Sequence, residues 1–88
     1  MVKIIYIGNL PFSINEDTVR ELFSEHGEVH AVKLVKDRKT KRSRGFGYVE
    51  MDDDNAAKAI DALDQLDFEQ RSLRVCEART YKGVIPDY

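Results

Sequence analysis

The chain has few of the residues that cross-link a protein or anchor it in a membrane. Its 88 residues include one cysteine, Cys76. A lone thiol cannot form an intramolecular disulfide framework or a multi-cysteine zinc site, so a reducing compartment is expected. No apolar run approaches the roughly 20 residues that span a bilayer, and no basic segment followed by an apolar stretch begins the chain. We therefore expect neither secretion nor membrane insertion.

Common catalytic and metal-binding motifs are also missing. The sequence contains no phosphate-binding loop, nucleophile elbow, dinucleotide fingerprint or calcium-loop spacing. His26 and His30 have no cysteine or acidic ligand pattern around them, which favours packing or surface roles. Cys76 has no activating partner in the sequence, so a small strand residue is favoured over a reactive thiol. The consecutive acids Asp52–Asp54 suit a helix start better than a cation site. We expect no enzyme, no cofactor and no metal.

The composition is typical of one small globular domain. A chain of this length with 42% hydrophobic residues can build a single core. Inspection finds no internal repeat and no low-complexity segment. Residues 80–88 lack a clear period and are predicted to form a flexible tail, which leaves residues 1–79 as the domain.

The net charge of −2 hides a strongly basic segment. Between Lys33 and Arg44, seven cations oppose the single acid Asp37, so this segment carries +6 and the rest of the chain −8. Screening limits the field of a surface charge to about 10 Å or less in physiological salt. A phosphate therefore meets the local cluster rather than the net charge, and the polarity favours one binding face.

The octapeptide from Arg44 to Met51 is the most informative segment. Its alternation is typical of a strand, because successive strand residues point to opposite faces. One face then carries Arg44, Phe46, Tyr48 and Glu50. The other carries Gly45, Gly47, Val49 and Met51. Two rings beside a cation are typical of a platform on which bases stack while the cation meets a phosphate, and the glycines permit close approach.

Periodicity predicts a strand–helix–strand–strand–helix–strand order along the chain. Residues 3–8 are predicted to be a strand, with Ile5 and Ile7 inward and Tyr6 outward. Asn15 is placed to cap a helix that ends at Gly27. A second strand is predicted over residues 29–36, with Lys33 on its outer face.

After the octapeptide strand, Asp52 or Asp53 is predicted to cap a second helix. A last strand is predicted from Leu73 to Ala78, with Leu73 and Val75 inward. Two helices cannot cover both faces of so short a four-stranded sheet, so a two-layer sandwich with one open face is expected. The rings of the chain's first and third strands would lie on that open face.

The octapeptide resembles the ribonucleoprotein octamer of the RNA-recognition motif family, although Met51 replaces the final aromatic residue. The segment Ile5–Leu10 is similar to the companion hexamer of the same family. The resemblance covers roughly residues 3–79. It implies an α+β fold, a βαββαβ ferredoxin-like two-layer sandwich whose antiparallel sheet has the order 4-1-3-2 and whose two helices lie on one face.

The resemblance also implies roles for individual residues, with single-stranded RNA as the partner. Rings at Tyr6 and Tyr48 would stack on bases, the ring at Phe46 would pack against sugars or between nucleotides, and Arg44 would contact phosphate. Weaker roles fall on cations of the second strand and the following loop and on the end of the last strand, namely Lys33, Arg38, Lys39, Lys41, Arg42, Cys76, Ala78 and Arg79.

Three departures from the family pattern affect this transfer. Lys41 stands where many relatives have glycine, and Gln70 stands where glycine commonly precedes Arg71. Because lysine and glutamine do not reach positive φ freely, a changed loop shape or a strained turn is expected at these two positions. Cys76 occupies a position where relatives often have a polar or larger residue, so hydrogen-bonded reading of bases there is expected to be weak.

Other functions stay open on the sequence alone. Stacking does not distinguish sugars, so single-stranded DNA is an alternative ligand, and the exposed rings could instead cover the sheet against another protein or the chain's own tail. A protein-interaction module could also use the acidic helix face. We expect a monomer that acts in post-transcriptional regulation or RNA chaperoning. A bacterial-like cytoplasmic protein is expected, or a nuclear one if the chain is excised from a eukaryotic protein.

Overall fold

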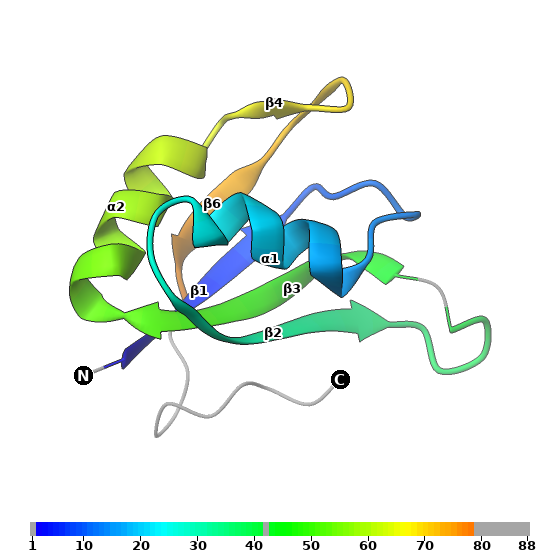
Figure 1. Cartoon of the computed structure of the whole chain (residues 1–88). Coiled ribbons are helices and arrows are strands. Elements are labelled where there is room, and N and C mark those ends of the chain that lie inside the picture. Colours follow the sequence, from blue (N-terminus) through cyan, green and yellow to red (C-terminus); the bar gives the residue numbers. More distant parts are fainter. Residues whose placement is uncertain (1, 42, 79–88) are drawn as a thin grey trace.

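The computed structural model describes residues 2–41 and 43–78. Two predicted phosphate contacts, Arg42 and Arg79, and the predicted tail at residues 80–88 lie outside these described residues. In chain order (Figure 1), the elements are β1 (Val2–Gly8), α1 (Glu16–Ser24), β2 (Val29–Lys36), β3 (Ser43–Asp52), α2 (Asp53–Leu63), β4 (Asp67–Phe68), β5 (Arg71–Ser72) and β6 (Arg74–Glu77).

The four long strands form one antiparallel sheet in the order β2-β3-β1-β6. Since β6 is the fourth long strand, this confirms the predicted order 4-1-3-2. The hexamer strand β1 and the octapeptide strand β3 are the two central strands, and Tyr6 pairs with Tyr48 across them. On its other side, Tyr6 pairs with Cys76 of β6.

The short β4–β5 hairpin was not predicted, because two-residue strands are too short for an alternation to show. Asp67 pairs with Ser72, and Phe68 pairs with Arg71. The hairpin reverses at Glu69 and Gln70, whose φ values are 47° and 66°. Two successive residues of positive φ are typical of the tight turns that join antiparallel strands. Lys41 likewise has a φ of 61°. Both non-glycine departures therefore take the left-handed conformation.

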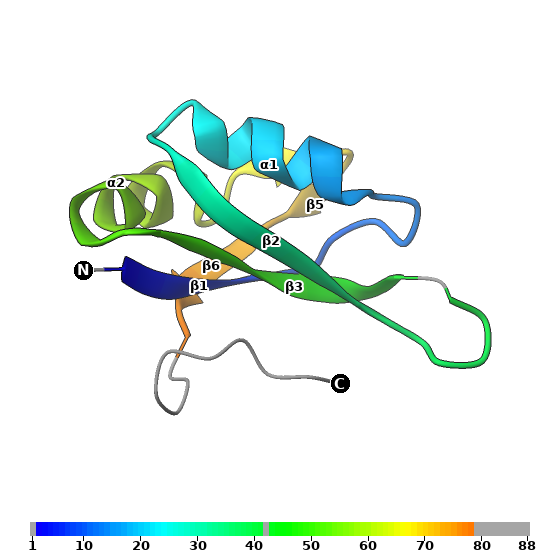
Figure 2. The same cartoon turned by 60° about the horizontal axis from the view of Figure 1, so that its bottom comes forward.

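Both helices lie on the same side of the sheet (Figure 2). The core between the layers contains the inward strand residues Ile5, Ile7, Val49 and Met51, all fully buried. Phe23 of α1 packs into the same cluster. Leu73 and Val75 are buried there too, as predicted. The two-layer sandwich with helices on one face is confirmed.

The start of each helix shows how far capping can be read from sequence. Asn15 is the N-cap of α1, and its Oδ1 accepts a hydrogen bond from the Thr18 N–H at 2.9 Å, as predicted. The helix ends at Ser24, earlier than the predicted Gly27, which follows in a turn with a φ of 146°. Asp52 is the N-cap of α2 by position, but its side chain makes no capping hydrogen bond.

The Asp52 carboxylate instead contacts a histidine of the neighbouring strand. His30 Nε2 lies 3.0 Å from Asp52 Oδ1, and Glu28 is 3.9 Å from the other ring nitrogen. The pairing of β2 with β3 shifts register between Val29 and Ala31, and His30 lies within this shift. Asp52 therefore takes the predicted N-cap position, but its carboxylate contacts His30 and not a main-chain N–H of the helix.

Candidate nucleic-acid interface

Three aromatic rings gather on the two central strands, on the face opposite the helices. Tyr6 comes from β1, and Phe46 and Tyr48 come from β3. The ring centroid of Tyr6 lies 6.0 Å from that of Phe46 and 6.0 Å from that of Tyr48, while Phe46 and Tyr48 are 6.5 Å apart. Edge-to-face and tilted pairs at such distances are favourable for aromatic side chains. We refer to these three rings as the ring platform.

The rings differ in how accessible they are. Tyr6 and Phe46 are partly buried, whereas Tyr48 is only 7% exposed. Tyr48 forms a second apolar cluster with Ile4 and Val35, and the other two rings pack against it. The sequence predicted the face on which Tyr48 lies but not its burial. Tyr6 and Phe46 therefore present more of their ring surface than Tyr48 does.

Arg44 extends the ring platform toward the basic loop. Its guanidinium carbon lies 5.8 Å from the centroid of the Phe46 ring, a distance suited to a cation–π contact. The side chain is exposed. Arg44 also lines a hollow of about 370 Å³ at the base of the loop between β2 and β3, together with Lys36, Asp37, Arg38 and Lys39. Two strand cations, Arg44 and Lys36, and two loop cations, Arg38 and Lys39, therefore gather at one end of the platform.

The loop owes its shape to its single acid. Asp37 Oδ1 accepts hydrogen bonds from the main-chain N–H groups of Lys39 at 2.8 Å and Thr40 at 3.1 Å. The Asp37 carbonyl accepts a third from the N–H of Lys41 at 2.8 Å. The N–H groups of Thr40 and Lys39, with Arg44 nearby, hold the pKa of the Asp37 carboxyl below its usual range. The sequence analysis treated Asp37 only as a counter-charge. Its position two residues before a Lys-Thr-Lys turn is the signal for this role.

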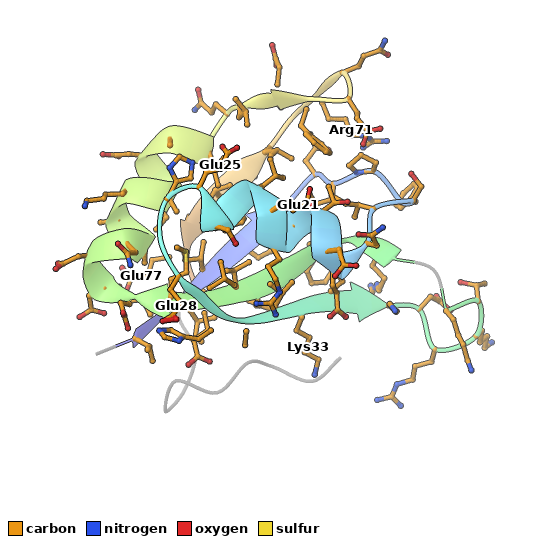
Figure 3. The ribbon with its side chains drawn as sticks, viewed as in Figure 1. Glu21, Glu25, Glu28, Lys33, Arg71 and Glu77 are labelled. Atoms are coloured by element: carbon orange, nitrogen blue, oxygen red, sulfur yellow. The ribbon has the colours of Figure 1, made fainter. Side chains whose placement is uncertain are left out.

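The cation Lys33 and two acidic side chains lie on opposite sides of the sheet. It stands opposite Tyr48 in the pairing of β2 with β3. Figure 3 draws Lys33 on the side of the sheet away from the helices, whereas Glu21 lies on α1 and Glu25 directly follows that helix. Glu21 and Glu25 therefore lie on the helix side of the sheet, away from the ring platform (Figure 3).

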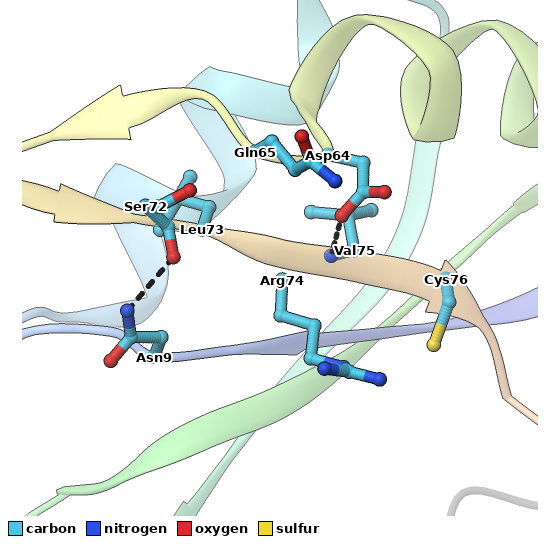
Figure 4. A pocket seen from close by; sticks show the side chains of 8 residues that line it. All are labelled: Asn9, Asp64, Gln65, Ser72, Leu73, Arg74, Val75 and Cys76. Atoms are coloured by element: carbon cyan, nitrogen blue, oxygen red, sulfur yellow. Dashed lines mark hydrogen bonds between the residues drawn. The ribbon is translucent and has the colours of Figure 1, made fainter.

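The edge strand β6 borders a second hollow, of about 440 Å³ (Figure 4). Cys76 is exposed beside it, while Ala78, beyond the strand, packs against the cluster of Tyr48. Asp64 Oδ1 accepts a hydrogen bond from the main-chain N–H of Val75 at 3.0 Å and so satisfies one donor of this edge strand. This hydrogen bond joins residues 11 positions apart and was not predicted from the sequence.

Two other classes of site are absent from the described part of the chain. Among residues 2–41 and 43–78, no group of three or more histidine, cysteine or acidic side chains is placed to hold a metal ion. No helix in the same ranges is long and apolar enough to cross a membrane.

Comparison with known proteins gives one family and many relatives. The family model described as RNA recognition motif matches residues 5–74. The RNA-binding protein CP31B of Arabidopsis thaliana chloroplasts is 47% identical over 79 residues, which are 86% of this chain and 27% of the relative. The protein RbpE of Nostoc sp. is 47% identical over 76 residues, 85% of this chain and 77% of the relative. The chain thus spans about a quarter of the chloroplast relative and about three quarters of the Nostoc one.

Solved structures agree with the sequence relatives. The crystal structure of RNA binding protein PG1 superposes with a TM-score of 0.86 at 40% identity, covering 90% of this chain and 96% of that one. The structure of the Rna15 RRM with bound RNA (GU) superposes with a TM-score of 0.80 at 27% identity, covering 88% of this chain and 83% of that one.

Proposed function

Because this chain belongs to the RNA recognition motif family, we propose that it binds a short single-stranded RNA segment of about two to four nucleotides across the ring platform. The observation that carries the proposal is the triangle of Tyr6, Phe46 and Tyr48 on the sheet face opposite the helices, with the Arg44 guanidinium over the Phe46 ring. Any base can stack on an aromatic ring, and a guanidinium can pair with the phosphate beside it.

The three rings divide the work according to their exposure. Tyr6 and Phe46 present ring surface that a base can contact without rearrangement. Tyr48 supports both of them from within its cluster with Ile4 and Val35. It becomes a stacking surface only as that cluster opens. Each stacked base contributes about 1 to 3 kcal/mol, so two accessible rings suffice for a measurable affinity.

The basic loop supplies the part of the affinity that depends on salt. Arg44 and the cations around the hollow at the loop base lie at one end of the platform. An RNA strand that leaves the rings in this direction meets them. With about three phosphates contacted, the slope of log affinity against log salt is near −2, at roughly −0.7 per phosphate for a single strand. Stacking on the rings adds little to this slope.

The decisive experiment removes the accessible rings and keeps the fold. In the double variant Tyr6→Leu/Phe46→Leu, the RNA affinity is expected to fall by about 30-fold to 10⁴-fold, since two stacking contributions of about 1 to 3 kcal/mol are lost. The matched control is Leu66→Ala, which removes an exposed apolar side chain outside the platform. Fluorescence anisotropy with labelled RNA of random sequence measures the affinity, and thermal unfolding verifies the fold. Wild-type affinity in the folded double variant would refute the proposal.

The same assay separates RNA from DNA. RNA offers a 2′-hydroxyl that DNA lacks, whereas both offer bases and phosphates to the rings and cations. Competition between matched RNA and DNA oligomers is expected to favour RNA. Equal competition would assign the platform to single-stranded nucleic acid in general.

We further propose a binding role without catalysis, for residues 1–79 acting as one monomeric domain. The family is one of RNA-binding domains, and the proteins that this chain resembles include a Nostoc protein and a chloroplast protein. The single thiol, Cys76, suits the reducing conditions of a cytoplasm, where we place the protein.

A further inference from the structure

One exposed ring lies outside the ring platform. Phe12, in the connection between β1 and α1, is 64% exposed, the highest value among the large apolar side chains of the described residues. A single exposed apolar side chain needs no explanation in itself. The surroundings of Phe12 are unusual, however, because the connection that contains Phe12 is hydrogen-bonded to the octapeptide strand β3.

A hydrogen bond joins this connection to β3, and the main chain of Gly45 lies close to it. The Leu10 N–H donates a hydrogen bond to the Gly45 carbonyl at 2.9 Å. Gly45 has a φ of 88°, and a Cβ at this position would lie 3.3 Å from the Leu10 oxygen and 3.6 Å from the Phe12 ring. A side chain at residue 45 would therefore crowd the connection. The Phe12 ring thus lies at van der Waals distance from residue 45, beside the strand that carries Phe46.

A fixed guanidinium faces the same ring. Arg71 of β5 has its Cζ 5.8 Å from the Phe12 centroid. Its Nη1 also donates to Asn9 Oδ1 at 3.3 Å, and Asn9 Nδ2 donates to the Ser72 carbonyl at 2.8 Å. Figure 3 draws Arg71 at the end of the molecule where the connection after β1 runs. The hairpin of β4 and β5 thus carries a cation that Asn9 holds in place.

These groups share one hollow with the platform. A volume of about 230 Å³ is lined by Phe12, Tyr6, Phe46, Arg44 and Arg71 among others, and none of the described residues that line it is acidic. Three rings and two guanidiniums therefore surround a single space. A nucleotide offers both of the groups that such a space binds, a flat π-face and an anionic phosphate.

We propose that Phe12 and Arg71 form an additional nucleotide subsite, in which the RNA strand leaving the ring platform stacks one further base on Phe12 while Arg71 and Arg44 contact the phosphates on either side. The inference rests on the proposed function, because it extends the same strand by one nucleotide. A simple cation–π contact between Arg71 and Phe12 would fasten the hairpin to the connection and contribute nothing to RNA binding. A substitution of Phe12 therefore weakens RNA binding if Phe12 belongs to a subsite, and leaves RNA binding unchanged if the contact only fastens the hairpin.

The test uses RNA pools of random sequence, four or nine nucleotides long, because only the longer RNA can occupy platform and subsite together. Wild-type protein is expected to bind the nine-nucleotide pool more tightly. Phe12→Leu, which keeps an apolar side chain against Gly45, is expected to weaken binding of the longer pool by about 5- to 100-fold and to leave the four-nucleotide pool unchanged. Arg71→Lys is expected to give a smaller loss than Arg71→Gln, because lysine keeps the charge but not the planar guanidinium.

A direct signal comes from Phe12→Trp. The chain has no tryptophan, so this variant carries a single indole. A base that stacks on the indole quenches its fluorescence, and the quenching is expected to saturate with the nine-nucleotide pool at the concentration at which binding saturates. No quenching at saturation, or wild-type affinity of folded Phe12→Leu for the longer pool, would overturn the subsite. If Tyr6→Leu/Phe46→Leu loses binding in the same experiment, the proposed function stands without the subsite. If that double variant binds like wild type, the proposed function itself fails.

Discussion

The two faces of the sheet each carry an apolar cluster, and the clusters have different uses. On the helix side, Ile5 and Val49 belong to a large core that is closed by both helices. On the opposite side, Ile4, Val35 and Tyr48 form a small cluster at the foot of the accessible rings. The central strands are thus packed on both faces. One cluster holds the fold together, and the other holds a binding surface in position.

Two adjacent isoleucines of β1 test whether the two clusters have different roles. Ile5 is 0% exposed in the core, and Ile4 is 4% exposed in the small cluster. Ile5→Ala is expected to lower the free energy of unfolding by about 3 to 4 kcal/mol, since it leaves a cavity between the layers. Ile4→Ala is expected to cost about 1 to 2 kcal/mol, because a small cluster near the surface can collapse around the gap.

Denaturant unfolding measures both values, and RNA binding adds the second half of the comparison. Ile4→Ala removes a support of Tyr48 and is expected to weaken RNA binding in the folded protein. Ile5→Ala is expected to bind like wild type under conditions where it stays folded. Equal losses of stability, or an RNA defect only in Ile5→Ala, would contradict a division of labour between the two faces.

The sequence predicted which face each strand residue occupies, but not how tightly that face is packed. Alternation places Tyr48 outward correctly, because the period of a strand is a local property. Tyr48 is clustered with Ile4 and Val35, which lie on the two flanking strands and become its neighbours only in the folded sheet. The missed bond between Asp52 and His30 has the same origin. Local rules predicted that Asp52 caps the helix, but its carboxylate hydrogen-bonds to His30, which lies 22 positions away in the sequence.

The subsite candidate was missed for a similar reason. Phe12 lies in a loop with no periodicity, and Arg71 lies on a two-residue strand. Nothing in the sequence between them indicates that Asn9 fixes the arginine beside the ring. By contrast, the platform was predicted, since Tyr6, Phe46 and Tyr48 belong to two motifs whose spacing is typical of one family.

The next comparison sets the cations of the basic loop against a cation of the helix layer. Lys39 lines the hollow beside Arg44, whereas Lys58 is exposed on α2. Lys39→Gln is expected to make the slope of log affinity against log salt shallower by about 0.7, because one phosphate contact is lost. Lys58→Gln is expected to leave the slope unchanged. Anisotropy titrations at several salt concentrations give both slopes, and equal slopes for the two variants would remove the loop from the interface.

A smaller effect is expected from the strained backbone positions. Gln70 and Lys41 both have φ above 60°, a conformation that costs a residue with a side chain about 1 kcal/mol relative to glycine. Gln70→Gly and Lys41→Gly are each expected to raise the melting temperature by about 4 to 8 °C. Only Lys41→Gly is expected to weaken RNA binding, because it also removes a loop charge. A lower melting temperature for Gln70→Gly would show that the hairpin turn depends on the glutamine side chain.

The smallest effect is expected where β2 meets the start of α2. The hydrogen bond with Asp52, with further attraction from Glu28 and Glu50, raises the pKa of His30 above its usual 6.5 although burial opposes the charge. A pKa that is raised on folding gives a contribution to stability that is complete below pH 6.5 and is lost as the pH rises through the higher folded value. The urea midpoint of wild type is therefore expected to fall slightly across this window. His30→Gln is expected to remove that fall, because it removes the ring that the Asp52 carboxylate contacts in place of capping the helix. His26→Gln is the matched control and is expected to keep the fall.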